Sequence, residues 1–344
     1  MASIRDVAKR AGVSIATVSA VMTGKRPVSA ELRARVEKAL KELDYRPNAL
    51  ARALYEKRSR TIAFLVPSIA NPGFSKALQQ VEKAADERGY AVFVANTEGL
   101  ERRVEACQHR LLDMRVDGVL IALTWELAKP EVVETFHRHK VEVVGLSGGR
   151  ILDSIDCYLG NEERAGEDIG RYLINLGHRR IAFIGPERSH VGTSRLQGLQ
   201  KAMEEAGMET PADMFFATSS YGRADGYEAA LNLLATPGAY SAIVVFNDLM
   251  ASGVLAALYS QGLQVPNHLS VATFGDEYAQ VTTPNLTTMV YNEGLAGWMA
   301  TQRLLDRIEG ICTAPPETHL QTMKLVIRGS TRLAEGTPLS SPSP

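Results

Sequence analysis

From Thr61 onward the chain alternates short apolar runs with helix-like segments, and this alternation is the strongest constraint on its fold. Seven of the apolar runs are typical of strands: Ile62–Val66, Ala91–Ala95, Gly118–Leu123, Val141–Gly145, Ile181–Gly185, Ala242–Phe246 and Leu269–Phe274. Helix-like segments separate most of them, near residues 74–88, 101–114, 130–139, 163–176, 194–206, 223–234, 249–261 and 294–309. Such alternation predicts parallel sheets with helices on both faces. It continues for about 270 residues, which is long for one doubly wound sheet, so we expect two lobes.

The first 45 residues lack this alternation and predict three short helices instead. Each predicted helix follows a serine, and Ser3, Ser14 and Ser29 can each accept a hydrogen bond from a backbone N–H of the first turn. Gly12 suits the left-handed residue that ends the first helix. Two short helices around a tight turn, within Ile4–Gly24, have the geometry of a helix-turn-helix.

The second of these helices has one apolar face and one face suited to a DNA groove. Val18, Val21 and Met22 are expected to point toward the other helices. The outward face carries Ala16, Ser19, Ala20 and Thr23, with Ile15 at its edge. Because this face is small and has no acidic residue, it can enter the major groove without clash or repulsion. A plain three-helix bundle without a DNA role remains the alternative on this pattern alone.

Charge is distributed unevenly along the chain, although the net charge is only −1. Residues 1–60 contain 14 Lys and Arg against 6 Asp and Glu, a balance of +8. The remaining residues contain 24 against 33, a balance of −9. A basic head on an acidic body indicates that only the head meets a polyanion.

Other features of the sequence indicate a cytoplasmic protein. No run of about 18 apolar residues occurs, so no membrane span is expected. Residues 1–6 lack a basic stretch followed by an apolar one, so no secretion signal is expected. Cys107, Cys157 and Cys312 are far apart and odd in number, which argues against a disulfide framework.

A series of motifs runs through most of the chain. They are Ile4–Ser14 (IRDVAKRAGVS), Ala16–Ser19 (ATVS), Tyr45–Leu54 (YRPNALARAL), Leu176–Ile181 (LGHRRI), Phe246–Asp248 (FND), Pro284–Thr288 (PNLTT) and Val326–Ser330 (VIRGS). In this order and spacing, over residues 2 to about 331, they closely resemble the lactose-repressor/galactose-repressor (LacI/GalR) family.

The resemblance implies an all-α helix-turn-helix domain followed by an α/β domain of two lobes, like the periplasmic binding proteins, with two doubly wound parallel sheets. The helix-turn-helix would occupy residues 1–46, a hinge helix and linker 47–59, and an effector-binding and dimerisation domain 60–331. The first lobe is expected at about 60–160 and 288–321, and the second at about 161–287 and 322–331. Residues 332–344 would form a disordered tail, since they are rich in Pro and Ser.

The resemblance also implies a function. The chain would be a transcriptional repressor that binds a palindromic DNA operator as a homodimer and has no catalytic activity. A small-molecule effector in the cleft between the lobes, such as a sugar, sugar acid or phosphosugar, would control it.

The positions implied to meet DNA fall into three groups. Ile15, Ala16 and Ala20 match base-reading positions, but relatives commonly carry a longer side chain such as Arg at position 20. A half-site read partly by apolar contact and shape is therefore expected. Matches to phosphate-contacting positions are Ser14, Thr17, Ser19, Thr23 and Ser29. In the hinge, Asn48 and Arg52 match DNA-contacting positions and Leu54 matches a minor-groove wedge; an interdomain linker with a chance apolar stripe is the alternative.

The positions implied to meet the effector combine aromatic and polar side chains. Phe74 and Tyr221 match aromatic positions of the cleft, and Arg195 and Asn247 match polar ones. Asp276 joins this set as the carboxylate beside position 275. The alternatives are that the aromatic residues belong to the core and that Asn247 caps a helix.

Two departures from the family's pattern bear on the ligand. Relatives usually carry Asp where this chain has Gly275 and Asn161. With these carboxylates missing near Arg195, we expect a less acidic cleft and an anionic ligand.

Rival functions receive weaker support. The segment Gly145–Gly149 fits the G-x-S-x-G pattern around Ser147, but the nucleophile elbow needs a helix directly after the serine, and none is expected. No metal site and no nicotinamide cofactor are expected, since His and Cys lack ligand spacing and no GxGxxG follows the first strand. A ligand-binding protein without a DNA role has no need of residues 1–58.

Overall fold

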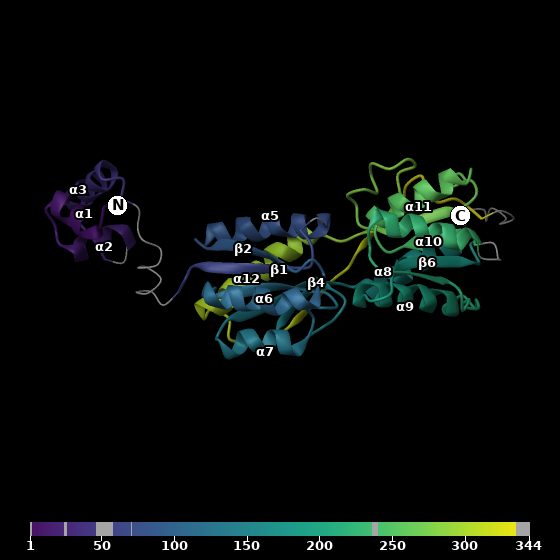
Figure 1. Cartoon of the computed structure of the whole chain (residues 1–344), viewed down its shortest axis with the longest axis horizontal. Helices are drawn as coiled ribbons and strands as arrows, with labels where there is room; N and C mark the ends of the chain where they lie inside the picture. The colour runs from purple at the N-terminus through teal and green to yellow at the C-terminus, as the bar shows by residue number, and fades with distance from the viewer. Residues whose placement is uncertain (1, 24–25, 46–57, 70, 236–239, 335–344) are drawn as a thin grey trace, which may run out of the picture. The chain divides into compact units, whose positions relative to one another are not determined.

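The computed structural model describes residues 2–23, 26–45, 58–69, 71–235 and 240–334, and it separates the chain into two compact units, Met1–Arg60 and Thr61–Pro344. Figure 1 shows both units. Most of the predicted hinge, 47–59, lies outside the described residues, as does the predicted tail beyond residue 334.

Among its described residues the first unit contains three helices, α1 (Ile4–Ala11), α2 (Ile15–Thr23) and α3 (Ala30–Glu42). Its serine caps are confirmed: the hydroxyls of Ser3, Ser14 and Ser29 accept hydrogen bonds from the backbone N–H groups of the first turns of α1, α2 and α3. Gly12 ends α1 with a φ of 64°, as the sequence predicts. The turn between α1 and α2 therefore has the tight geometry of a helix-turn-helix.

A small core and an arginine clamp hold this unit together. Val7, Val18 and Val36 come from the three helices and are fully buried. Arg35 of α3 donates to the carbonyl of Ala11 at 2.7 Å and to that of Gly12 at 3.2 Å. These carbonyls lie at the C-terminus of α1, where a cation is favoured, so α3 fixes the turn that precedes α2.

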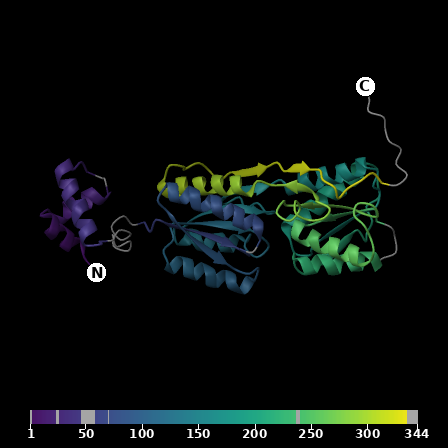
Figure 2. The same cartoon turned by 90° about the horizontal axis from the view of Figure 1, so that it is seen from above.

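The second unit contains two six-stranded sheets, each in its own lobe. The sheet of the first lobe has the order β11-β5-β4-β3-β1-β2, and all its pairings are parallel. Its strands are β1 (Thr61–Val66), β2 (Ala91–Asn96), β3 (Gly118–Leu123), β4 (Glu142–Gly148), β5 (Asp156–Gly160) and β11 (Thr318–Gln321). Helices α5 (Pro72–Glu87) and α12 (Glu293–Glu309) pack side by side on one face, as Figure 2 shows. The other face carries α6 (Glu101–Asp113) and α7 (Pro130–Arg138).

The sheet of the second lobe has the order β12-β10-β9-β8-β6-β7. Its strands are β6 (Ile181–Pro186), β7 (Phe215–Thr218), β8 (Ala242–Val245), β9 (Ser270–Phe274), β10 (Thr287–Val290) and β12 (Lys324–Val326). Only the pairing of β12 with β10 is antiparallel within the described residues. The helices of this lobe form two pairs, α8 (Glu162–Asn175) with α9 (His190–Glu205) and α10 (Arg223–Ala235) with α11 (Asp248–Ser260). Central strands such as β3, β8 and β9 are buried along their whole length, as expected for sheets covered on both faces.

The chain passes between the lobes three times. It crosses from β5 to α8, from β10 to α12 and from β11 to β12. The second crossing differs from the predicted boundary at 287/288, since β10 pairs with β9 in the second sheet and the chain returns only after Val290. The predicted strands did not include β10. The two-lobed α/β fold itself is confirmed.

Two close approaches between helices depend on glycine. A Cβ added at Gly166 of α8 would lie 2.1 Å from the carbonyl oxygen of Arg195, and one at Gly198 of α9 would lie 1.9 Å from that of Glu163. The two helices can therefore approach closely only because both positions lack a side chain. This contact brings the first turn of α8 against the middle of α9.

No helix among the described residues is both long enough and apolar enough to cross a membrane. No group of three or more His, Cys, Asp or Glu side chains among them could hold a metal ion.

Candidate functional site

The outward face of α2 is small, uncharged and accessible. Val18 and Val21 are buried and Met22 packs against the same core, as predicted. Ile15 is 45% exposed, Ala16 is exposed and Ala20 is half-buried. An apolar tip of this kind can contact the methyl groups of thymine in a major groove.

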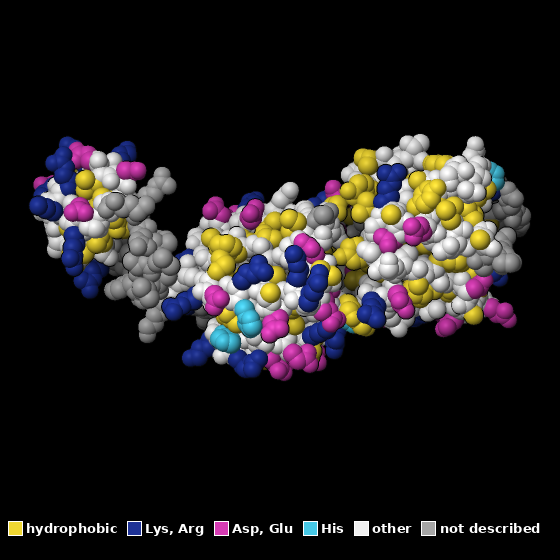
Figure 3. Space-filling model, viewed as in Figure 1, with side chains coloured by type: hydrophobic (Ala, Val, Ile, Leu, Met, Phe, Trp, Pro, Cys, Tyr) yellow, Lys and Arg dark blue, Asp and Glu magenta, His cyan; other side chains and the backbone are white. Residues whose placement is uncertain are grey.

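The hydroxyl groups beside this face take part in capping. Ser14 accepts from the N–H of Thr17 at 3.1 Å, and the two hydroxyl oxygens lie 2.9 Å apart. Ser29 is exposed and caps α3, while Ser19 is half-buried on α2. The side chain of Thr23 lies outside the described part of the structure, as do the predicted hinge residues Asn48, Arg52 and Leu54. Figure 3 shows Lys and Arg side chains around apolar ones on one face of this unit.

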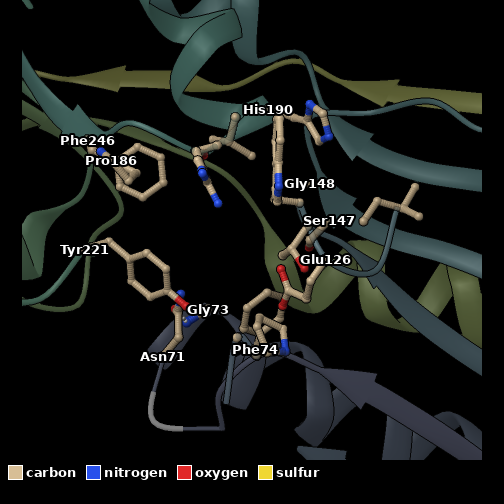
Figure 4. Close-up of a pocket in the computed structure, with 18 of the residues that line it drawn as sticks. Asn71, Gly73, Phe74, Glu126, Ser147, Gly148, Pro186, His190, Tyr221 and Phe246 are labelled. Atoms are coloured by element: carbon tan, nitrogen blue, oxygen red, sulfur yellow. Dashed lines mark hydrogen bonds between the residues drawn. The ribbon is translucent and has the colours of Figure 1, made fainter. Parts of the chain in front are cut away.

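A cleft of about 560 Å³ lies between the two lobes of the second unit. Many of its lining residues directly follow the carboxyl ends of strands, where ligands bind in open α/β sheets. Phe74 and Glu126 line one side of the cavity, and Tyr221 and Phe246 line the other, as Figure 4 shows. A ligand in this cleft would therefore contact both lobes.

Aromatic rings form much of the apolar wall. Phe74, in the first turn of α5, packs edge to face against Phe64 with ring centroids 6.4 Å apart. Tyr221 packs against Phe246 at 6.3 Å. The sequence predicted Phe74 and Tyr221 as wall residues, and both line the cleft.

A ring stack spans the two lobes. Trp125 follows β3 in the first lobe and stacks on His190, the first residue of α9 in the second lobe, at a centroid distance of 4.8 Å. Burial lowers the pKa of His190, and nearby Arg150 lowers it further. This pair was not predicted from the sequence, because nothing local relates two residues from different lobes. The available signal was that Trp125 lies just after a strand and His190 at the start of a helix.

Arg195 lies in the cleft as predicted, but its charge is already paired. Its Nε donates to the Glu162 carboxylate at 2.7 Å and its Nη1 donates to the Phe246 carbonyl. The guanidinium carbon lies 4.0 Å from the centroid of the Phe274 ring. Burial raises the pKa of Glu162, although Arg195 opposes this shift. The pair is largely buried, with side chains 11% and 8% exposed.

Asn247 and Asp276 lie beside the cleft rather than on its wall. Both line a smaller neighbouring hollow of about 80 Å³. Asn247 caps α11 by accepting from the N–H of Met250 at 2.7 Å, and its amide donates to the carbonyl of Tyr221 at 3.2 Å. Asp276 forms an ion pair with Arg328 at 2.6 Å. Asn247 therefore acts as the helix cap that the sequence offered as the alternative to a ligand contact. It also fixes the backbone of Tyr221, which lines the cleft.

The expectation of a cleft less acidic than in relatives stays a prediction, but the cleft of this chain contains more carboxylates than cations. The lining side chains include two arginines, Arg188 and Arg195, and five glutamates, Glu98, Glu101, Glu126, Glu162 and Glu293. Asn161 is uncharged and caps α8, and Gly275 has a φ of 90° beside Asp248. The carboxylates of the cleft come from loops that follow strands and from the first turns of helices. The residues at positions 161 and 275 therefore do not determine how many carboxylates line the cleft.

Glu126 differs from the other glutamates of the cleft. It is only 7% exposed, and within the described residues its Oε1 has no hydrogen-bond partner. Its charge contributes to raising the pKa of Tyr221, after the larger effect of burial. A buried carboxylate oxygen without a donor is costly, so it points to a ligand or water that supplies one.

The G-x-S-x-G segment lines the cleft without forming a nucleophile elbow. Ser147 has a φ of 55° and Gly148 one of 121°, both within the last residues of β4. The next element is β5, and the next helix, α8, begins only at Glu162. The strand–serine–helix arrangement of a hydrolase is therefore not formed around Ser147.

Comparisons with known proteins agree for both units. Residues 3–48 match the model of bacterial regulatory proteins of the lacI family, and residues 171–331 match that of the periplasmic binding protein-like domain. The chain is 38% identical over 312 residues to the ribose operon repressor of Escherichia coli (strain K12), covering 90% of this chain and 93% of the relative. It is 37% identical over 313 residues to the HTH-type transcriptional repressor PurR of Edwardsiella ictaluri (strain 93-146), covering 90% and 91%.

Solved structures extend the likeness to the whole fold. A lac repressor dimer bound to operator and the anti-inducer ONPF matches with a TM-score of 0.83 and 28% identity, covering 96% of this chain and 99% of that chain. A complex of the transcriptional regulator CelR with cellobiose matches with a TM-score of 0.73 and 28% identity, covering 96% and 100%. With the helix-turn-helix, the two lobes and the interlobe cleft all in place, the chain belongs to the LacI family of bacterial transcriptional regulators.

Proposed function

We propose that this chain represses transcription by binding a palindromic operator as a homodimer, under the control of a small molecule held between its lobes. The observation that carries the proposal is that one chain combines a helix-turn-helix unit with a cleft at the carboxyl ends of two parallel sheets. Similar proteins are named as repressors, and one similar structure contains a repressor dimer on its operator. A dimer suits such a site because a palindromic operator shares its two-fold symmetry.

The outward face of α2 reads the half-site. Ile15 and Ala16 are exposed and apolar, so they contact thymine methyl groups in the major groove. Ala20 is too short for a bidentate contact to guanine, which leaves shape and apolar contact to supply the specificity at its base step.

Phosphate contacts and the hinge position this face on the duplex. The hydroxyl-bearing residues near the DNA backbone are Ser14, Thr17, Ser19, Thr23 and Ser29. Asn48 and Arg52 of the hinge contact the DNA, and Leu54 enters the minor groove as a wedge. This assignment rests on the match of the segment Tyr45–Leu54 to the family's motif.

The effector binds in the cleft with its ring against Phe74 and Tyr221, while Arg195 offers a donor from the second lobe. Asn247 and Asp276 contribute from the neighbouring hollow, Asn247 by holding the backbone of Tyr221. Because the effector contacts both lobes, it binds one interlobe arrangement better than another and shifts the population toward it. Roughly 1–3 kcal/mol of such coupling is enough to change operator occupancy.

The chain acts by binding, without catalysis, in the cytoplasm. Support for the first point is the missing elbow geometry at Ser147 and the names of the similar proteins as regulators. Support for the second is that Cys107, Cys157 and Cys312 are all free thiols, which suits a reducing compartment.

Selection of DNA sites from a random duplex pool tests the proposal. The full chain at low salt should enrich a palindromic site, and Ile15→Glu should abolish the enrichment because it places a charge against the bases. Ile311→Glu is the matched control, since Ile311 is 68% exposed on the second unit. A pool that remains random with the unaltered chain, or a selection that survives Ile15→Glu, contradicts the proposal.

A further inference from the structure

We propose that the first lobe makes a DNA contact of its own: a cationic end of this lobe binds phosphates of the duplex outside the palindrome that α2 reads. The inference rests on the proposed function, because it takes the duplex to be an operator held by the first unit. It revises the sequence-based expectation that only the basic head of the chain meets a polyanion.

The cationic end lies where the chain enters the second unit. It consists of residues 58–60, which precede β1, and of residues 110–117 and 135–142, which include the last turns of α6 and α7 and lead into β3 and β4. The three segments are neighbours in space, because β1 pairs with β3 and β3 pairs with β4. Accordingly, the N–H of Asp117 donates to the carbonyl of Thr61 at 2.8 Å.

The charge of this end is opposite in sign to that of the unit to which it belongs. Its three segments contain six Lys and Arg against three Asp and Glu, a balance of +3, whereas residues 61–344 have a balance of −9. Figure 3 shows His side chains beside Lys and Arg side chains on this part of the first lobe. Four of the cations are exposed and form no ion pair within the described residues: Arg110, Arg115, Arg138 and Lys140. Their charge is therefore available to a partner.

Two of these cations occupy a backbone conformation that favours glycine. Arg115 has a φ of 55° and Lys140 a φ of 59°. Each follows the end of a helix in the same turn: the N–H of Arg115 donates to the carbonyl of Leu112 at 2.9 Å, and that of Lys140 to the carbonyl of His137 at 2.9 Å. A residue with a Cβ is less stable than glycine in this conformation, so both cations carry a cost in the folded state.

Elsewhere the chain makes this turn with glycine. The positive-φ residues that follow α5, α8, α9 and α11 are Gly89, Gly177, Gly207 and Gly262. Helix ends of this kind therefore do not need a cation, and stabilisation of α6 and α7 does not account for Arg115 and Lys140. Two cations in place of glycine, in the lobe that the chain enters from the DNA-reading unit, point to the binding of a polyanion.

Duplex DNA is the polyanion that this end can reach. Tyr45 of the first unit and Arg58 are 13 residues apart in the sequence, and a chain of that length spans at most roughly 45 Å. One turn of B-DNA is about 34 Å long, so the phosphates that adjoin a half-site lie within this range. Such contacts carry no sequence information, but they add affinity and make it depend on salt.

Two duplexes of different length test the inference on the full chain. One carries only the palindrome obtained by site selection, and the other extends it by about ten base pairs on each side, which is one helical turn. Fluorescence anisotropy measures the affinity for each duplex over a range of salt concentrations. The double variant Arg115→Gly with Lys140→Gly removes two charges and gives both turns the glycine that the second lobe uses, so its Tm should not fall. The matched control is Arg180→Gln with Lys324→Gln, which removes two exposed cations of the second lobe.

The unaltered chain should bind the longer duplex more tightly and with a steeper salt dependence. The double variant removes two phosphate contacts from each protomer, which is four from a dimer. At about 0.9 per contact, the slope of log K against log salt on the longer duplex should become shallower by roughly 3–4, and the affinity should fall at least about tenfold at low salt. On the short duplex the double variant should bind as the unaltered chain does, and the control should match the unaltered chain on both.

Three results overturn the inference. The first is an unchanged affinity and salt slope of the double variant on the longer duplex, and the second is an equal loss on both duplexes. The third is unchanged DNA binding together with the loss of salt-sensitive binding to polyglutamate, which would assign the cationic end to an acidic protein.

The inference and the proposed function fail separately. If the chain enriches a palindrome while the flanking base pairs add nothing to binding, only the inference is wrong and the repressor function stands. If the chain enriches no palindrome while the double variant loses affinity for long duplexes of random sequence, the operator function is wrong and the cationic end stands as a DNA contact.

Discussion

Replacing Arg195 by methionine should cost this protein a large part of the stability of its second lobe. Methionine retains much of the aliphatic length of arginine but leaves Glu162 without its partner. The Glu162 side chain is 8% exposed, so the uncompensated charge stays largely out of water. Removing one partner of a buried ion pair costs about 3–5 kcal/mol, against no comparable gain from the methionine.

The size of the loss should depend on pH, and its sign follows from Glu162. Burial already raises the pKa of this carboxyl in the folded protein, and loss of Arg195 raises it further. A carboxyl with a raised pKa binds its proton more readily in the folded state, so its contribution favours folding at low pH and is lost as pH rises through that pKa. The destabilisation of Arg195→Met should therefore be larger at pH 8 than at pH 5.5.

Thermal unfolding of the full chain at both pH values measures this effect. A loss of about 3–5 kcal/mol corresponds to a fall in Tm on the order of 10 °C for a lobe of this size. Arg180→Met is the matched control, because Arg180 pairs with Asp213 at the surface of the same lobe, where both side chains are exposed. The predicted cost is refuted if Arg195→Met lowers the Tm no more than Arg180→Met, or if its effect is the same at both pH values.

Three further predictions concern the operator and the cleft. Ala20→Arg should add a preference for guanine worth about 1–3 kcal/mol at one base step of each half-site; site selection that returns the unaltered preference contradicts the placement of α2. Leu54→Ala should weaken operator binding and reduce the bend, because an inserted leucine kinks the duplex; an unchanged bend in a gel-phasing assay counts against the wedge. Burial raises the pKa of Glu293, with Lys76 opposing the shift, so the charged form is disfavoured in the folded state. Glu293→Gln should therefore raise the Tm at pH 8 and lose this advantage as the pH falls toward 5, and a pH-independent difference between the two proteins would argue that Glu293 is not buried in its charged form.

Much of the interior of the fold was predictable from long apolar runs, although the short buried strands β5 and β10 were not among the predicted strands. Strands such as β3 and β9 are buried on both faces, and continuous apolar runs encode them directly. Edge strands carry no such signal: β11 alternates between exposed and half-buried positions, and β12 has three residues. Such strands form because a neighbouring strand offers hydrogen-bonding groups, and that neighbour is far away in the sequence.

The site was only partly predictable for a related reason. Phe74, Tyr221 and Arg195 could be placed by resemblance, and all three line the cleft. The stack of Trp125 on His190 depends on how two lobes meet, which no local pattern encodes. The charge of the cleft likewise depends on which glutamates point into it and which of them form ion pairs. The sequence alone does not show that Glu101 pairs with Lys129 while Glu126 has a carboxylate oxygen without a partner among the described residues.

The path of the chain between the lobes has a consequence for synthesis. Each sheet takes an edge strand from the stretch Thr318–Val326, β11 in the first lobe and β12 in the second. Neither lobe can therefore complete its sheet until the ribosome has translated the codons for Thr318–Val326. A stop codon before codon 318 would remove the edge strands of both sheets. We therefore expect that no such truncated protein keeps one complete lobe able to bind an effector.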